Sequence, residues 1–138
     1  MKSLIITCLL LVVPISAHSL NFIYEGAEQH KVCLDKVTTA LGLDDTDVTV
    51  YLREKYMQEA KKGYVASTKF EKTFIMVLNL KLADGGMTTF ETIAHEMVHI
   101  EQHVRGIDMP LTGKYRHRAN EIEAFDREKG LSKACYTR

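Results

Sequence analysis

Apolar residues recur along the chain with two different spacings, which predict helices in some segments and strands in others. Three segments carry them at helical spacing, and three shorter segments either alternate or are rich in β-branched residues. The predicted helices cover residues 28–41, 88–105 and 118–129, and the predicted strands cover residues 48–52, 64–68 and 73–80. A helix, then strands, then two helices predict an α+β fold with a small, mainly antiparallel sheet.

The ends of the predicted helices carry residues that are typical of caps. Thr88 and Glu91 have the spacing of a capping box, which predicts that the second helix begins at Thr88. Gly42, Gly106 and Gly130 follow the three helices at positions where a helix commonly ends. Each glycine is therefore expected to end the helix before it.

The first 17 residues have the layout of a secretory signal peptide. A short basic start precedes an apolar run over residues 4–13, and Pro14 to Ala17 supply a breaker and a small residue for cleavage. The run is shorter than the roughly 20 apolar residues that a membrane-spanning helix needs. We expect a secreted or periplasmic protein with a single domain over residues 18–138; a buried N-terminal helix or strand is the alternative.

Net charge and cysteine content indicate which classes of binding partner and which cellular compartment to expect. The chain has 18 Lys and Arg against 18 Asp and Glu, so no basic excess favours nucleic acid or a membrane surface. Without residues 1–17, two cysteines are left, Cys33 and Cys135. They form a disulfide candidate in an oxidising compartment, and two free thiols are the alternative.

The second predicted helix carries the sequence His95-Glu96-Met97-Val98-His99, an H-E-x-x-H motif. Residues four apart share one face of a helix, so both imidazoles can bind one ion. Glu96 lies close enough to polarise a zinc-bound water without being a ligand. The motif predicts a Zn²⁺ site with His95 and His99 as ligands and Glu96 as the catalytic base.

The rest of this helix is consistent with that interpretation. An apolar stripe of Ile93, Met97, Ile100 and Val104 lies roughly opposite the two histidines. A catalytic zinc site needs a third protein ligand and an open position. His103 cannot supply it, because eight residues of helix separate it from His95 by about 12 Å.

The third predicted helix offers that ligand in Asn120-Glu121-Ile122-Glu123-Ala124. Together with H-E-x-x-H, this segment resembles the gluzincins, the thermolysin-like zinc peptidases, and more narrowly a group of small metallopeptidases of phages and bacteria. The resemblance covers about residues 73–131 and implies a minimal zincin-like domain with Glu121 as the third zinc ligand. Glu123 is the alternative ligand; it lies about 200° around the helix from Glu121, so both cannot face one ion.

The chain departs from the family pattern at one position, and other roles are expected by analogy. The family often has an Asp four residues after the ligand Glu that orients a ligand histidine, but here that position is Phe125. Tyr115 and His117 precede the third helix and are the candidate oxyanion donors. In such sheets the strand before the active-site helix, here residues 73–80, commonly binds substrate backbone, with Asn79 as a contact.

These observations predict a secreted or periplasmic zinc metalloendopeptidase that acts on a peptide or protein substrate. No nucleic acid partner and no membrane span are expected. The alternatives are an endopeptidase or amidase that cuts peptidoglycan cross-links during lysis, and a zinc-binding module without catalysis. The substrate and the oligomeric state do not follow from the sequence.

Overall fold

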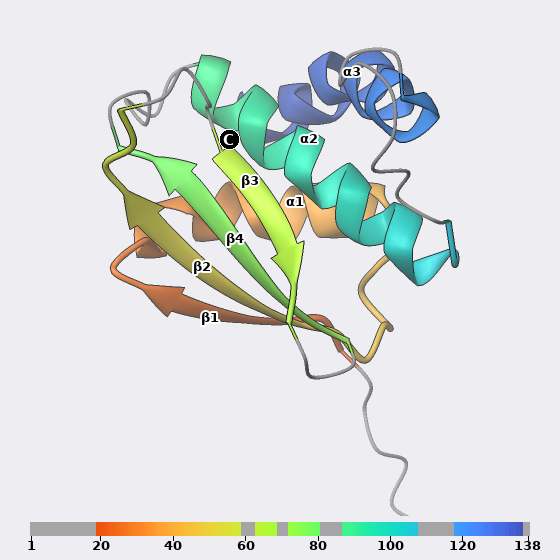
Figure 1. Ribbon diagram of the computed structural model, residues 1–138, viewed down its shortest axis with the longest axis horizontal. Coiled ribbons are helices and arrows are strands. Elements are labelled where there is room, and N and C mark those ends of the chain that lie inside the picture. Colours follow the sequence, from red (N-terminus) through yellow and green to blue (C-terminus); the bar gives the residue numbers. More distant parts are fainter. Residues whose placement is uncertain (1–18, 59–62, 69–71, 81–86, 108–117, 137–138) are drawn as a thin grey trace, which may run out of the picture.

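The structure is a computed structural model that describes residues 19–58, 63–68, 72–80, 87–107 and 118–136. It has the expected α+β architecture, with a four-stranded sheet and helices packed against it (Figure 1). The strands are β1 (Asn21–Glu25), β2 (Thr49–Lys55), β3 (Gly63–Ser67) and β4 (Thr73–Asn79), and the helices are α1 (Lys31–Ala40), α2 (Met87–Val104) and α3 (Ala119–Ser132). The predicted signal peptide lies outside the described residues.

The sheet is mixed, so the expectation of a mainly antiparallel sheet is wrong. The strand order is β1-β2-β4-β3; β1 and β4 both run parallel to β2, and only β3 is antiparallel to its neighbour β4. The reason is the connection between β1 and β2. A helix, α1, crosses between these strands, and such crossovers join parallel strands. The strand β1 was not predicted from the sequence.

One face of the sheet and the inner faces of the helices form the hydrophobic core. Alternate residues of β2 and β4, such as Leu52 and Met76, are fully buried against Leu34 of α1 and Met97 of α2. The opposite face of the sheet carries exposed residues such as Arg53. The described helices therefore lie on one side of the sheet.

Helix α2 is buried on all sides over residues 92–100, because α1 and the sheet cover one side and α3 covers another. The predicted apolar stripe is confirmed for Ile93, Met97 and Ile100, which are fully buried, whereas Val104 is 43% exposed. The helix begins at Met87, one residue before Thr88, so Thr88 is not its N-cap. Gly106 ends the helix as expected: its φ of 75° is left-handed, where a side chain would be strained.

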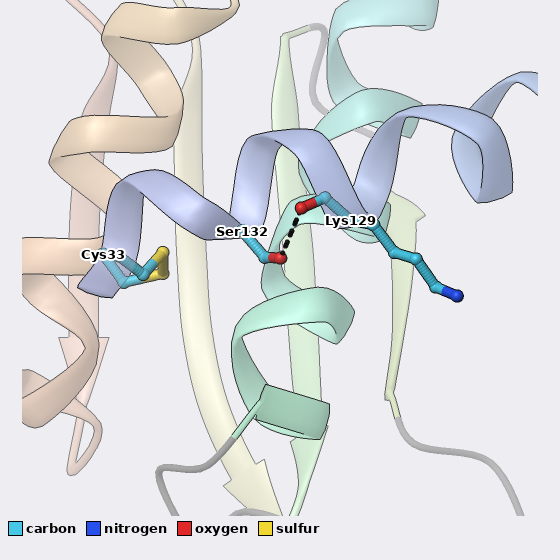
Figure 2. Close-up of a disulfide and its surroundings, with 4 residues drawn as sticks. Cys33, Lys129 and Ser132 are labelled. Atoms are coloured by element: carbon cyan, nitrogen blue, oxygen red, sulfur yellow. Dashed lines mark hydrogen bonds between the residues drawn. A yellow bond between two sulfur atoms is a disulfide. The ribbon is translucent and has the colours of Figure 1, made fainter. Parts of the chain in front are cut away.

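Helix α3 packs along α2 on the side away from the sheet (Figure 1). A disulfide ties the turn that follows α3, Lys133–Tyr136, to α1. The sulfur atoms of the predicted pair, Cys33 and Cys135, lie at bonding distance. Figure 2 shows this disulfide beside the last turn of α3, where the Ser132 hydroxyl donates a hydrogen bond to the Lys129 carbonyl. The helix continues through Gly130, so the prediction that it ends there is wrong.

None of the helices in the described part of the chain combines the length and the apolar character needed to cross a membrane.

Candidate metal centre

Two turns of α2 and the first turn of α3 bring three metal-ligating side chains together. His95 and His99 lie on one face of α2, four residues apart, and Glu121 reaches them from α3. All three are buried, with exposed fractions of 5–6%. One ligand atom from each lies within 4.8 Å of the other two, so this buried group could bind a metal ion.

The distances between the facing atoms fit a single small ion with tetrahedral ligands. Nε2 of His95 lies 3.2 Å from Nε2 of His99 and 3.2 Å from Oε2 of Glu121, and Nε2 of His99 lies 3.4 Å from the same oxygen. Tetrahedral ligands about 2.0–2.1 Å from a zinc ion would be about 3.3–3.4 Å apart. The spacing of the three atoms is therefore that of three ligands of one such ion.

The ring of His95 is oriented by two residues of α3. Its outer nitrogen, Nδ1, lies 2.9 Å from Oε2 of Glu128, and its ring packs against Phe125 with centroids 4.7 Å apart. An ionised carboxylate only accepts hydrogen bonds, so Nδ1 is the donor. In the neutral ring the lone pair then sits on Nε2, which faces Glu121 and His99.

The ring of His99 is held in the corresponding way within α2. Its Nδ1 lies 2.8 Å from Oε1 of Gln102, whose side chain is fully buried. With Nδ1 as the donor, Nε2 of His99 also carries a lone pair toward the centre. Two imidazole lone pairs and one carboxylate oxygen thus face one another, and such acceptors repel unless a cation lies between them.

In the metal-free protein a proton is the available cation, and the histidine pKa values agree with this. Burial lowers the pKa of His95, but hydrogen bonding to Glu121 and the charge of Glu96 outweigh it and raise the pKa above its ordinary value. Burial also lowers the pKa of His99, but hydrogen bonds with Glu121 and Gln102 outweigh it, so the pKa of His99 is raised as well. The site therefore attracts positive charge.

Glu96 lies beside the ligands without belonging to the ligand group. It is 5% exposed, and burial raises the pKa of its carboxyl group, opposed by the nearby His95 and His99. A backbone hydrogen bond from Val65 on β3 reaches the same carboxyl group and lowers its pKa. Glu96 is thus a buried acid, close to the metal ligands and held by the outer strand of the sheet.

Glu123, the alternative third ligand, has other partners. Its Oε1 accepts hydrogen bonds from Arg105 at 2.6 Å and from Arg127 at 2.9 Å, and its Oε2 accepts one from Gln102 at 2.9 Å. Burial raises the pKa of Glu123, but the hydrogen bonds from Gln102 and the arginines outweigh it and hold the pKa below its usual range. The structure therefore brings Glu121, and not Glu123, to the two histidines.

The remaining predicted residues fall outside the centre or outside the described chain. His103 is exposed and packs edge-on against Phe74, in agreement with its exclusion as a ligand. Tyr115 and His117 lie outside the described residues. Asn79 was expected to contact substrate, but it is 1% exposed and its amide exchanges hydrogen bonds with the backbone of Met57.

The strand expected to bind substrate, residues 73–80, does not lie at an edge of the sheet. The strand β4, which covers most of residues 73–80, pairs with β2 on one side and with β3 on the other, so neither of its edges is open. In the described residues it is β3 that forms the outer strand on this side of the sheet, and β3 is the strand that contacts Glu96.

Two residues that orient the ligands were missed in the sequence. Glu128 lies seven residues, or two helical turns, after Glu121 and therefore on the same face of α3. It supplies the carboxylate that the family pattern would place at Phe125. Gln102 lies three residues after His99, within reach on the same helix face. In both cases helical spacing from an identified ligand was the available signal.

Comparisons of this chain with protein-family models, with curated proteins and with solved structures find no match.

Proposed function

We propose that the protein is a zinc-dependent peptidase in which His95, His99 and Glu121 bind the metal and Glu96 is the general base. The observation that carries this proposal is the convergence of three buried lone-pair atoms at tetrahedral spacing. Two imidazoles, one carboxylate and an open fourth position form the ligand set of catalytic zinc. Oxygen-rich sites, in contrast, favour magnesium or calcium.

Bound zinc would polarise a substrate carbonyl and lower the pKa of a bound water to about 7. Glu96 is placed to accept a proton from the attacking water and to donate it again. Its carboxyl group lies next to both ligand histidines, and burial raises its pKa above the ordinary value, which is the direction that favours a carboxyl group acting in proton transfer. In this proposal Glu96 takes a proton from the attacking water and donates it to the leaving amine nitrogen. Tyr115 and His117 stay the predicted oxyanion donors.

The position of β3 supports an extended peptide as the substrate. The backbone N–H of Val65 bonds Glu96, so it points away from β4 and toward α2. No described strand pairs with that outer edge of β3. An extended peptide that added to this edge by main-chain hydrogen bonds would run past Glu96 and the two histidines.

The proposal includes a secreted or periplasmic location. The bond between Cys33 and Cys135 supports it, because disulfides persist mainly in oxidising compartments. The signal-peptide layout of residues 1–17 supports it independently.

The test compares Glu96→Gln with the wild type and with Glu91→Gln, a control of the same charge change on the same helix. We expect Glu96→Gln to bind zinc normally and to lose peptide hydrolysis by at least about 100-fold, the lower end of general-base contributions. Glu91→Gln is expected to behave as the wild type. Normal hydrolysis by Glu96→Gln would refute the mechanism.

The substrates used in that assay also separate the alternatives. Casein and purified cell walls are offered in parallel to the zinc-loaded wild type. Hydrolysis of cell walls alone indicates an enzyme of peptidoglycan cross-links. Zinc binding with no turnover on either substrate indicates a metal-binding module and contradicts the proposed catalysis.

A further inference from the structure

We propose that Gln102 is a positioning residue for the metal centre and that Glu123 holds its amide, so that the proton of His99 is kept on Nδ1 and Nε2 is left free for the ion. The inference rests on the metal-binding part of the proposed function and not on peptide hydrolysis. It assigns roles to the two residues that link the centre to the charged surface of α2 and α3.

The first step is the orientation of the Gln102 amide. Its nitrogen, Nε2, donates one hydrogen bond to the backbone carbonyl of Asn120 at 2.9 Å and another to the Glu123 carboxylate at 2.9 Å. Neither partner can donate: a carbonyl has no proton, and the carboxylate already accepts hydrogen bonds from two guanidinium groups. Turning the amide over would place its oxygen against both acceptors, so the amide has one favourable orientation.

The second step is the tautomer of His99. In the favourable orientation the amide oxygen, Oε1, faces Nδ1 of His99 at 2.8 Å. An amide oxygen only accepts hydrogen bonds, so Nδ1 must carry the proton. The lone pair of the neutral ring is then on Nε2, which lies 3.2 Å from Nε2 of His95 and 3.4 Å from the Glu121 carboxylate. The amide therefore selects the tautomer that binds metal.

The third step is the support for Glu123. Arg105 and Arg127 each bond both Glu123 and Glu101, which gives a closed ring of two cations and two anions between α2 and α3. Glu123 is the member of this ring that also contacts Gln102. Glu101 belongs to the same ring, and in the described part of the chain its carboxylate bonds the two arginines. The pair provides a matched control, because either residue can lose its charge in the same network.

The test measures zinc affinity by competition with a chromophoric chelator, on the full chain and without an activity assay. We expect Gln102→Leu to weaken zinc binding about 10- to 100-fold, the usual effect of losing a residue that orients a ligand. Glu123→Gln is expected to weaken it several-fold, and Glu101→Gln to leave it unchanged. Because Glu123 acts through Gln102, the double variant should bind zinc no more weakly than Gln102→Leu alone.

A second readout follows the tautomer directly and needs no substitution at Gln102. Nitrogen-15 spectra of the metal-free wild type, recorded above the pH at which the His99 ring has become neutral, should show His99 protonated at Nδ1. The resonances are assigned with a His99→Ala variant. A merely structural role for Gln102 would not set this tautomer, so the measurement remains decisive if Gln102→Leu fails to fold.

Three results would overturn the proposal. The first is a His99 ring protonated at Nε2 in the wild type. The second is Gln102→Leu protein that folds and binds zinc as tightly as the wild type. The third concerns Glu123: an equal loss of affinity in Glu101→Gln and Glu123→Gln would mean that the ring acts without the contact to Gln102. If the wild type itself binds no zinc, the proposed function fails, while the tautomer measurement still decides the role of the amide.

Discussion

Breaking the disulfide between Cys33 and Cys135 should destabilise the protein mainly by freeing its unfolded chain. The two cysteines are 102 residues apart, so the bond closes a loop that spans most of the described chain. It ties the turn after α3 to α1, whereas α3 itself also packs along α2. Because those native contacts do not depend on the bond, we expect the reduced protein to keep its fold under native conditions.

The expected loss of stability follows from the loop length. In the chain-entropy model a loop of about 100 residues corresponds to about 4.7 kcal/mol at 25 °C. For a domain of this size, 1 kcal/mol shifts the melting temperature by about 4 °C, so reduction should lower it by roughly 15 to 20 °C. The freed chain also exposes more surface on unfolding, which should raise the m-value in denaturant.

Guanidinium unfolding of the oxidised protein, with and without a phosphine reductant, measures both the free energy of unfolding and the m-value. The variant Cys33→Ala/Cys135→Ala is the control, because it has no bond to reduce and should not respond to the reductant. An unchanged midpoint for the reduced wild type would refute the reasoning. A loss of stability without a rise in m would place the effect in native contacts and not in the unfolded chain.

Four further predictions concern single side chains. A methyl group at Gly63 would lie 2.8 Å from the carbonyl oxygen of Val77, so Gly63→Ala should cost about 1–3 kcal/mol in chemical denaturation. Gly130→Ala, in a helix with open space around it, should instead stabilise by up to about 1 kcal/mol. Glu121→Gln should abolish stoichiometric zinc binding in a metal analysis, because it replaces the charged carboxylate ligand with a neutral amide. Glu128→Gln should keep zinc but weaken its binding about 10- to 100-fold in chelator competition, because it alters the acceptor of His95; unchanged affinity would contradict that role.

The helices and three of the strands were predictable because their signals are local. Periodicity over residues 28–41 and 88–105 finds α1 and α2 closely, and the run at 73–80 finds β4. Strand direction is not local. The two-residue period of a strand is the same in parallel and antiparallel sheets, and once β1 was missed, the crossover through α1 that makes the sheet mixed could not be recognised.

The residues of the candidate site also divide into those with a local sequence signal and those without one. His95, Glu96 and His99 follow from spacing along one helix, and this spacing needs no knowledge of the tertiary structure. Glu121 required the resemblance to a family, because nothing local distinguishes it from Glu123. The packing of α3 on α2 decides between them, since it turns Glu121 to the histidines and Glu123 to Arg105 and Arg127.

The central claim is that one metal ion is bound by His95, His99 and Glu121. Anomalous scattering at the zinc absorption edge, recorded from crystals of the zinc-loaded protein, tests it most directly. We predict a single peak within bonding distance of both Nε2 atoms and of the Glu121 carboxylate. The absence of a peak there, or a peak bound through Glu123, would contradict the account.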